Sequence, residues 1–180
     1  RSGAAIIVNS GNANAFTGGN GQQAVVKVTG SVASALGVPR DRVFSSSTGP
    51  IGEPLPADRI TAIVDKLAGE LDATGVADAA RAIMTTDTFA KGATASLEAE
   101  GGRINIVGIA KGSGMIAPDM ATMLVYVFTD ARIAPDLLQR ILSSQLAGTF
   151  NAITVDSDTS TSDALILAAT GKSPAAEITD

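Results

Sequence analysis

Hydroxyl, amide and lysine side chains gather in three loops of this sequence, and each loop also holds several glycines. The loops cover residues 9–21, 48–54 and 111–122, and each follows or precedes an apolar run. Backbone N–H groups at the ends of strands are good donors to an anion or a developing oxyanion. Glycine also lets a substrate approach the backbone closely. The three loops are therefore the candidate sites of chemistry.

Cysteine and histidine are absent from the sequence. Their absence excludes disulfide scaffolds, zinc fingers, iron–sulfur clusters, haem held by these residues and cysteine proteases. It also excludes any Ser-His-Asp arrangement built within the chain. Catalysis here has to use hydroxyls, carboxylates, lysines, backbone N–H groups or an amino terminus.

Thr122 is the candidate nucleophile. A threonine hydroxyl needs an adjacent base, and a threonine that becomes a new amino terminus after peptide cleavage carries one. Its α-amine, with a pKa of about 7.7–8.0, can accept the hydroxyl proton. Such a threonine should follow a small residue where a loop meets a buried strand, and Thr122 lies between Ala121 and the apolar run 123–128. The pattern alone is weak, because threonine often begins strands through its β propensity.

Short strands and amphipathic helices are expected to position these loops. In the helix expected over 22–36, Val25, Val28, Val32 and Leu36 share one face, and Gly37 is a suitable residue to end it. Glu100-Gly101-Gly102 marks a hairpin turn, and 85–91 is expected to be extended. The remaining expected elements are strands over 4–8, 42–47, 93–98, 103–110, 123–129 and 152–155, and helices over 56–71, 76–84, 134–147 and 164–169. The mixture predicts an α+β or layered α/β fold.

Length and charge narrow the class of protein. The 180 residues suit a single domain, and 45% of them are apolar. The net charge is −5 and no run of Lys or Arg occurs, so neither nucleic acid nor a membrane surface is an expected partner. The longest apolar runs are too short to span a membrane. The lack of cysteine and of a signal peptide favours the cytoplasm. Because the chain opens without Met, directly before a strand, we expect a fragment of a longer protein.

The segment 111–124, KGSGMIAPDMATML, closely resembles the self-cleavage region of the bifunctional ornithine acetyltransferase (glutamate N-acetyltransferase, ArgJ) family. Further segments agree in the family's order, so the resemblance covers nearly the whole chain: VNSGNANA at 8–15, SSTGPIG at 46–52, MTTDT at 84–88 and VDSDTST at 155–161. The resemblance implies an αββα sandwich, with helices outside two stacked sheets, that is incomplete in this chain. It also implies that residues 1–121 belong to the α chain and 122–180 begin the β chain after self-cleavage.

The resemblance further implies roles for individual residues. Thr122 is the nucleophile exposed by cleavage between Ala121 and Thr122, and it also contacts substrate. Thr48 and Gly49 are the oxyanion-stabilising pair, and Thr88 and Lys111 are substrate contacts. The implied reaction moves the acetyl group of N2-acetyl-L-ornithine to L-glutamate through acetyl-Thr122, with no cofactor and no metal. Some relatives also accept acetyl-CoA as donor. The implied assembly is a heterotetramer of two α and two β chains.

Each assignment has a structural alternative. Without the motif, a solvated surface lysine is the favoured interpretation of Lys111, Thr48 suits a turn cap, and Gly49 suits a position that needs positive φ. Asp156, Asp158 and Asp163 lack the glycine and terminal glutamate of a calcium loop, so helix capping and solvation are favoured for them. Ordinary strand or turn roles also suit Thr85, Thr86, Thr88, Asn9, Asn12 and Asn14. For the whole protein, the alternatives are a self-processing aminopeptidase of similar fold and a non-catalytic module that binds a small amino acid.

Overall fold

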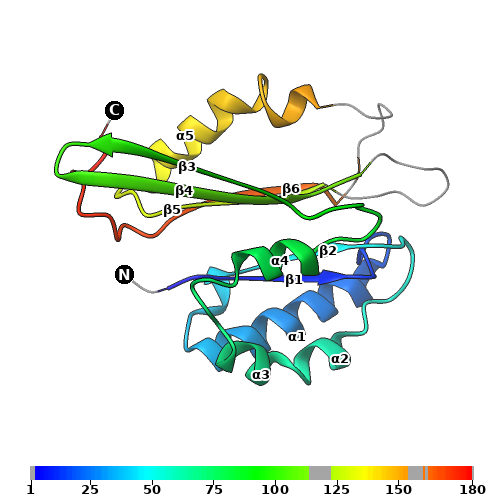
Figure 1. The fold of residues 1–180 in the computed structure, drawn as a ribbon. Coiled ribbons are helices and arrows are strands. Elements are labelled where there is room, and N and C mark those ends of the chain that lie inside the picture. Colours follow the sequence, from blue (N-terminus) through cyan, green and yellow to red (C-terminus); the bar gives the residue numbers. More distant parts are fainter. Residues whose placement is uncertain (1–2, 114–122, 154–159, 161, 180) are drawn as a thin grey trace.

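Helices cover the outer faces of two stacked sheets in a computed structural model, which describes residues 3–113, 123–153, 160 and 162–179 (Figure 1). The helices α1 (Gly18–Leu36), α2 (Ala57–Thr61) and α3 (Val64–Gly69) lie outside the sheet of β1 (Ala5–Ser10) and β2 (Val43–Thr48) (Figure 1). Helix α5 (Pro135–Leu146) lies outside the sheet of β3 (Lys91–Ala99), β4 (Gly102–Lys111), β5 (Leu124–Thr129) and β6 (Ala164–Ala169). This order of layers confirms the expected αββα sandwich. None of the helices within the described residues is long and apolar enough to cross a membrane.

The first sheet pairs β1 (Ala5–Ser10) with β2 (Val43–Thr48) in parallel. Alternate residues of β1 face opposite sides, as strand geometry requires. Ile6 and Val8 pack into the core between the sheets, whereas Ala5 and Ile7 pack with residues of α1 (Gly18–Leu36). Gly37 ends α1 in the left-handed conformation, with φ of 64°, and donates its N–H to the Ala33 carbonyl. The strands over 4–8 and 42–47 and the helix over 22–36 are thereby confirmed.

The single helix expected over 56–71 is wrong, because the segment forms α2 (Ala57–Thr61) and α3 (Val64–Gly69). A tight turn, in which the Ile63 N–H donates to the Ile60 carbonyl, separates them. The turn leaves Ile63 48% exposed and buries Val64 to 3% exposure against Val32 and Val43. Tertiary packing against α1 and β2 therefore buries Val64 at the start of α3.

The second sheet has the order β3–β4–β5–β6. The hairpin is confirmed, with a turn at Gly101 and Gly102, whose φ values are 80° and 154°. The helix expected over 164–169 is wrong: the segment is β6, parallel to β5, and the Ala164 N–H donates to the Met123 carbonyl. A six-residue apolar run shows no period that separates helix from strand, and pairing with β5 satisfies its backbone. The strand bounds are Lys91–Ala99 for β3, Gly102–Lys111 for β4, Leu124–Thr129 for β5 and Ala164–Ala169 for β6.

The helices over 76–84 and 134–147 are confirmed as α4 (Val76–Ala82) and α5 (Pro135–Leu146). The strand expected over 152–155 is wrong at its start, because Phe150–Ala152 is a 3-10 helix, and residues 154–155 lie outside the described part of the chain. The segment 85–90 is bent rather than extended. The cause of the bend is local, since the Asp87 carboxylate accepts the Thr85 N–H at 3.3 Å.

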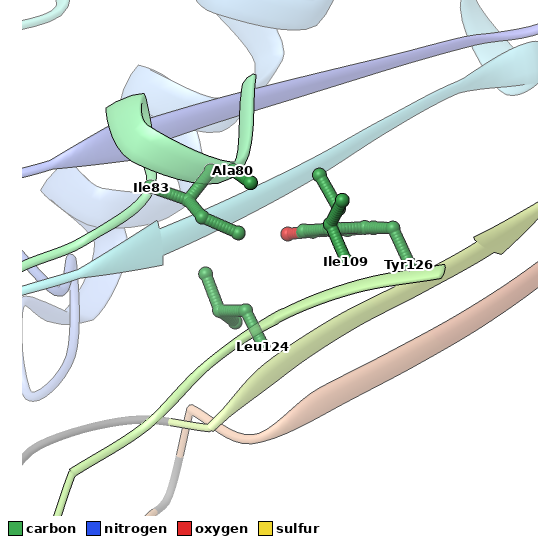
Figure 2. Packing of buried hydrophobic residues seen from close by; sticks show 5 residues of the cluster. All are labelled: Ala80, Ile83, Ile109, Leu124 and Tyr126. Atoms are coloured by element: carbon green, nitrogen blue, oxygen red, sulfur yellow. The ribbon is translucent and has the colours of Figure 1, made fainter. Parts of the chain in front are cut away.

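The core between the sheets is shared by α4, β4 and β5. Figure 2 shows Ala80 of α4 and Ile83, the residue that follows α4, directed at Ile109 of β4 and at Leu124 and Tyr126 of β5. Because α4 leads directly into the bend 85–90, this packing sets where the bend begins. The core thereby holds the bend beside the ends of β2 and β4.

We expect Ile109→Ala to lower the free energy of unfolding by about 2–5 kcal/mol, since Ile109 is 6% exposed in the core between the sheets. Ile109→Val, which removes a single methylene, should cost about 0.5–1.5 kcal/mol. Urea unfolding of the full-length gene product, followed by circular dichroism, measures both. Equal stability of the wild type and Ile109→Ala would contradict this core.

Candidate functional site

Lys111 and Thr48, the last residues of β4 and β2, meet between the two sheets. Lys111 Nζ donates to Thr48 Oγ1 at 3.0 Å, although the two residues are 63 positions apart in the chain. Thr48 is 0% exposed and Lys111 is 1% exposed. The alternative of a solvated surface lysine is therefore wrong for Lys111. A buried ammonium beside a hydroxyl makes this sheet edge a candidate for handling negative charge.

Thr85 supplies a second acceptor for Lys111. Thr85 lies in the bend that follows α4, and its Oγ1 accepts a hydrogen bond from Lys111 Nζ at 2.8 Å. Thr85 was expected to be only an ordinary strand or turn threonine. The signal that could have identified it is its place in the segment 84–88, one of the motifs on which the family resemblance stands.

Asp87 is the other site residue that the sequence analysis missed. Its side chain is fully buried and accepts Lys91 Nζ at 2.6 Å, the Gly112 N–H at 2.8 Å and the Thr85 N–H at 3.3 Å. Burial acts to raise the pKa of the Asp87 carboxyl, but these hydrogen bonds and the Lys91 charge outweigh it, so the pKa is lower than usual. Asp87 is therefore an anion at neutral pH.

Burial lowers the pKa of the Lys111 ammonium below its ordinary value. The Asp87 carboxylate opposes this decrease, the Lys91 charge adds to it, and the Asp163 carboxylate opposes it. The two hydroxyls that accept hydrogen bonds from Lys111 are neutral. The charge of Lys111 therefore depends on carboxylates that lie outside its own hydrogen bonds.

Gly49 lies where the loop after β2 crosses the loop after β1. The N–H groups of Gly11 and Asn12 donate to the Thr48 carbonyl at 2.8 and 3.0 Å. Gly49 has φ of 137°, and a Cβ there would lie 2.5 Å from the Asn12 backbone nitrogen. Among the described residues, neither the Gly49 N–H nor the Thr48 hydroxyl proton has an acceptor. Two adjacent donors thus remain available at the edge where Lys111 lies.

The asparagines of the first loop hold this crossing in place. Asn12 Nδ2 donates to the Glu53 carbonyl at 2.9 Å, and Asn9 Nδ2 donates to the Asn12 carbonyl at 2.9 Å. The Ser47 hydroxyl donates to Asn9 Oδ1 at 2.6 Å. These bonds join the loop after β1 to β2 and to the loop after it, so a structural role suits the asparagines.

The remaining predicted site residues are not brought into this cluster. Thr88 is exposed, and its side chain makes no hydrogen bond with another described residue. Ala121 and Thr122 lie outside the described residues, as do Asp156 and Asp158. Met123, which follows Thr122, donates its N–H to Asp163 Oδ1 at 2.8 Å. Asp163 was expected to cap a helix, but the segment that follows it is the strand β6. Its carboxylate instead accepts the Met123 N–H and fixes the start of β5.

Metal ligands do not gather in the described ranges, where no group of three or more acidic side chains could hold an ion. The chemistry available there comes from an ammonium, hydroxyls, a buried carboxylate and backbone N–H groups. These groups can donate to an oxyanion and can bind a carboxylate.

A model of the ArgJ family matches residues 1–180. The arginine biosynthesis bifunctional protein ArgJ of Ruegeria pomeroyi is 62% identical over 170 residues, which are 94% of this chain and 42% of that protein. The protein of the same name from Gluconobacter oxydans is 53% identical over 176 residues, 98% of this chain and 42% of its own length. This chain thus spans less than half the length of these relatives. The crystal structure of Bacillus halodurans ArgJ matches with a TM-score of 0.57 and 38% identity, over 66% of this chain and 60% of that one.

We expect Gly49→Ala to destabilise the protein by about 2 kcal/mol or more, because its Cβ would meet the backbone of Gly11 and Asn12 at a positive φ. Gly52→Ala is the matched control, since Gly52 has φ of 90° but no atom within 4 Å of a Cβ. It should cost about 1 kcal/mol, from backbone strain alone. Urea unfolding of both variants measures the difference. Equal losses would show that the two loops do not cross as closely as described.

Proposed function

This chain belongs to the ArgJ family, and from that premise we propose that it is part of the catalytic domain of an acyltransferase of arginine biosynthesis. The enzyme transfers the acetyl group of N2-acetyl-L-ornithine to L-glutamate. The observation that carries the proposal is the buried contact of Lys111 with Thr48, beside two donors without acceptors among the described residues. Such a group of donors suits the negative charge of an acyl-transfer intermediate.

The first half of the reaction begins after cleavage between Ala121 and Thr122. The Thr122 hydroxyl oxygen attacks the acetyl carbonyl carbon, and the freed α-amine of Thr122 accepts the hydroxyl proton. The carbonyl oxygen becomes an oxyanion, to which the Thr48 hydroxyl and the Gly49 N–H donate. The C–N bond then breaks, ornithine leaves with the proton on its amine, and an acetyl ester remains on Thr122.

The second half repeats these steps with glutamate as the nucleophile. The glutamate amine attacks the ester carbonyl, and the same two donors stabilise the oxyanion. The bond to the Thr122 oxygen breaks, the hydroxyl regains a proton, and N-acetylglutamate leaves. Lys111 and Thr88 contact the substrate, and the Lys111 ammonium can pair with a substrate carboxylate.

The register of the second sheet supports this role for Thr122. Lys111 lies opposite Leu124 in the antiparallel pair of β4 and β5. Thr122 precedes Leu124 by two residues. The backbone that leads to Thr122 therefore leaves β5 at the sheet edge where Lys111 contacts Thr48.

The proposal extends to the organisation of the whole protein. Residues 1–121 belong to the α chain, residues 122–180 begin the β chain, and two chains of each kind form a heterotetramer. The reaction needs no cofactor. Acetyl-CoA is a second donor to be tested, because it replaces acetylornithine in the first step without changing the nucleophile.

We expect the full-length gene product to be recovered as two polypeptides cut between Ala121 and Thr122, and Thr122→Ala to remain one chain. Cleavage needs the Thr122 hydroxyl, which alanine lacks. Intact-mass spectrometry measures both proteins. A single uncut chain in the wild type would leave Thr122 without its base, and would favour the amino-acid-binding module. Cleavage with turnover of free peptides but not of acetylornithine would favour the aminopeptidase.

We expect Thr48→Val to lower kcat for acetyl transfer by about 10²–10³-fold, because it removes one oxyanion donor and keeps the shape of the side chain. Thr94→Val is the matched control: Thr94 is exposed on β3, away from the site. Its kcat should match that of the wild type. Initial rates of N-acetylglutamate formation measure both variants. An unchanged rate in Thr48→Val would remove Thr48 from the mechanism.

A further inference from the structure

Asp87 is a buried carboxylate to which the proposed reaction gives no task. Among the described residues, its carboxylate accepts hydrogen bonds from Lys91, from Gly112 and from Thr85. Gly112 follows Lys111 in the chain, and Thr85 is one of the two residues to which Lys111 donates. The Gly112 N–H, directly after Lys111, donates to Asp87 Oδ1 at 2.8 Å, and this bond fixes the end of β4. The Thr85 N–H donates to Asp87 Oδ2 at 3.3 Å, and the hydroxyl of the same Thr85 accepts from Lys111. A single carboxylate therefore sets the positions of Lys111 and of one of its acceptors.

The charge state of Lys111 determines the direction of its hydrogen bond with Thr48. An ammonium has three donors and no acceptor, so a charged Lys111 can only donate to Thr48 Oγ1. The Thr48 proton is then free to point away from Lys111. A neutral amine has a lone pair and can accept that proton instead. In that case the Thr48 hydroxyl would no longer donate to an oxyanion.

Within the described part of the chain, three charged side chains act on Lys111. Asp87 and Asp163 favour its charged form, and Lys91 disfavours it. Lys91 itself is paired with Asp87 and is one-third exposed at its side chain, so its charge is partly solvated. The Tyr126 phenol, on the next strand of the sheet, has its pKa raised by burial and stays neutral. Of these two carboxylates, Asp87 is buried and Asp163 is exposed.

The geometry points to Asp87 as a positioning residue: it holds Lys111 as a charged donor, so that the Thr48 hydroxyl is directed at the oxyanion. This inference rests on the proposed function for the role of Thr48. Its first part, the dependence of the Lys111 charge on Asp87, does not need that function. The two parts can therefore be tested separately.

The first test measures the titration of Lys111 by NMR in the full-length protein labelled with carbon-13 at lysine Cε. The signal of Lys111 is assigned by its loss in Lys111→Met. We expect Asp87→Asn to move the titration of Lys111 to lower pH by about one unit or more, because an opposite charge is removed. Lys91→Met should move it to higher pH, because a like charge is removed. Because the two variants shift the Lys111 titration in opposite directions, Lys91→Met alone still tests the inference if Asp87→Asn does not fold.

Asp130→Asn is the matched control. Asp130 is also a carboxylate with two hydrogen bonds, both from Asn105. It follows β5, at the opposite end from the Leu124 that pairs with Lys111. Asp130→Asn should leave the Lys111 titration unchanged. An Asp87→Asn protein in which Lys111 titrates as in the wild type would overturn the inference, as would a downward shift in Lys91→Met.

The second test measures kcat/KM for acetyl transfer against pH. The alkaline limb of the Asp87→Asn profile should move to lower pH together with the Lys111 titration, which lowers kcat/KM about tenfold near that limb. A merely structural role for Asp87 would lower kcat/KM at every pH and leave the limb in place, and that result would overturn the positioning role. A wild type that transfers no acetyl group would refute the proposed function, whereas the NMR titration would still decide whether Asp87 controls Lys111.

Discussion

The Lys111 ammonium is almost completely removed from water, and this constraint determines what the surrounding chain has to provide. An isolated buried charge is unstable, so the protein must supply hydrogen-bond acceptors and an opposite charge. Thr48 and Thr85 supply the acceptors, and Asp87 contributes the negative charge. Each comes from a different part of the chain. A slip of one residue in β4 would turn Lys111 to the other face of the sheet, so the site depends on strand register.

Apolar packing and the polar site are parts of one layer. Ile109 and Lys111 are two residues apart on β4 and therefore point to the same side of the sheet. Ile109 packs with Ala80 of α4 and with Ile83, which follows α4, in the core between the sheets (Figure 2). The bend that carries Thr85 and Asp87 follows this helix directly. Burial of a few aliphatic side chains thus sets the spacing over which the hydrogen bonds of Lys111 form.

Local signals in the sequence were sufficient for the helix that ends at Gly37 and for the hairpin at Gly101, because each depends on neighbouring residues. They were insufficient for 164–169, whose strand character comes from pairing with β5, and for 56–71, where packing of Val64 breaks the helix. At the site, the motifs indicated Thr48 and Lys111 but not their contact, which spans 63 residues. The long-range contacts of Thr85 and Asp87 were missed because Lys111 and Gly112, which donate to them, lie about 25 residues further along the chain.

The pairing of β4 with β5 acquires a different meaning if the chain is cut between residues 121 and 122. Six residue pairs, from Ile106 with Thr129 to Lys111 with Leu124, would then join two polypeptides rather than two parts of one. The bond from Met123 to Asp163 and the pairing of β5 with β6 would stay within the second polypeptide. The cut would therefore turn the middle of a sheet into a subunit interface. Separating the two products would require opening the hydrophobic core, so maturation would yield an obligate complex without an assembly step.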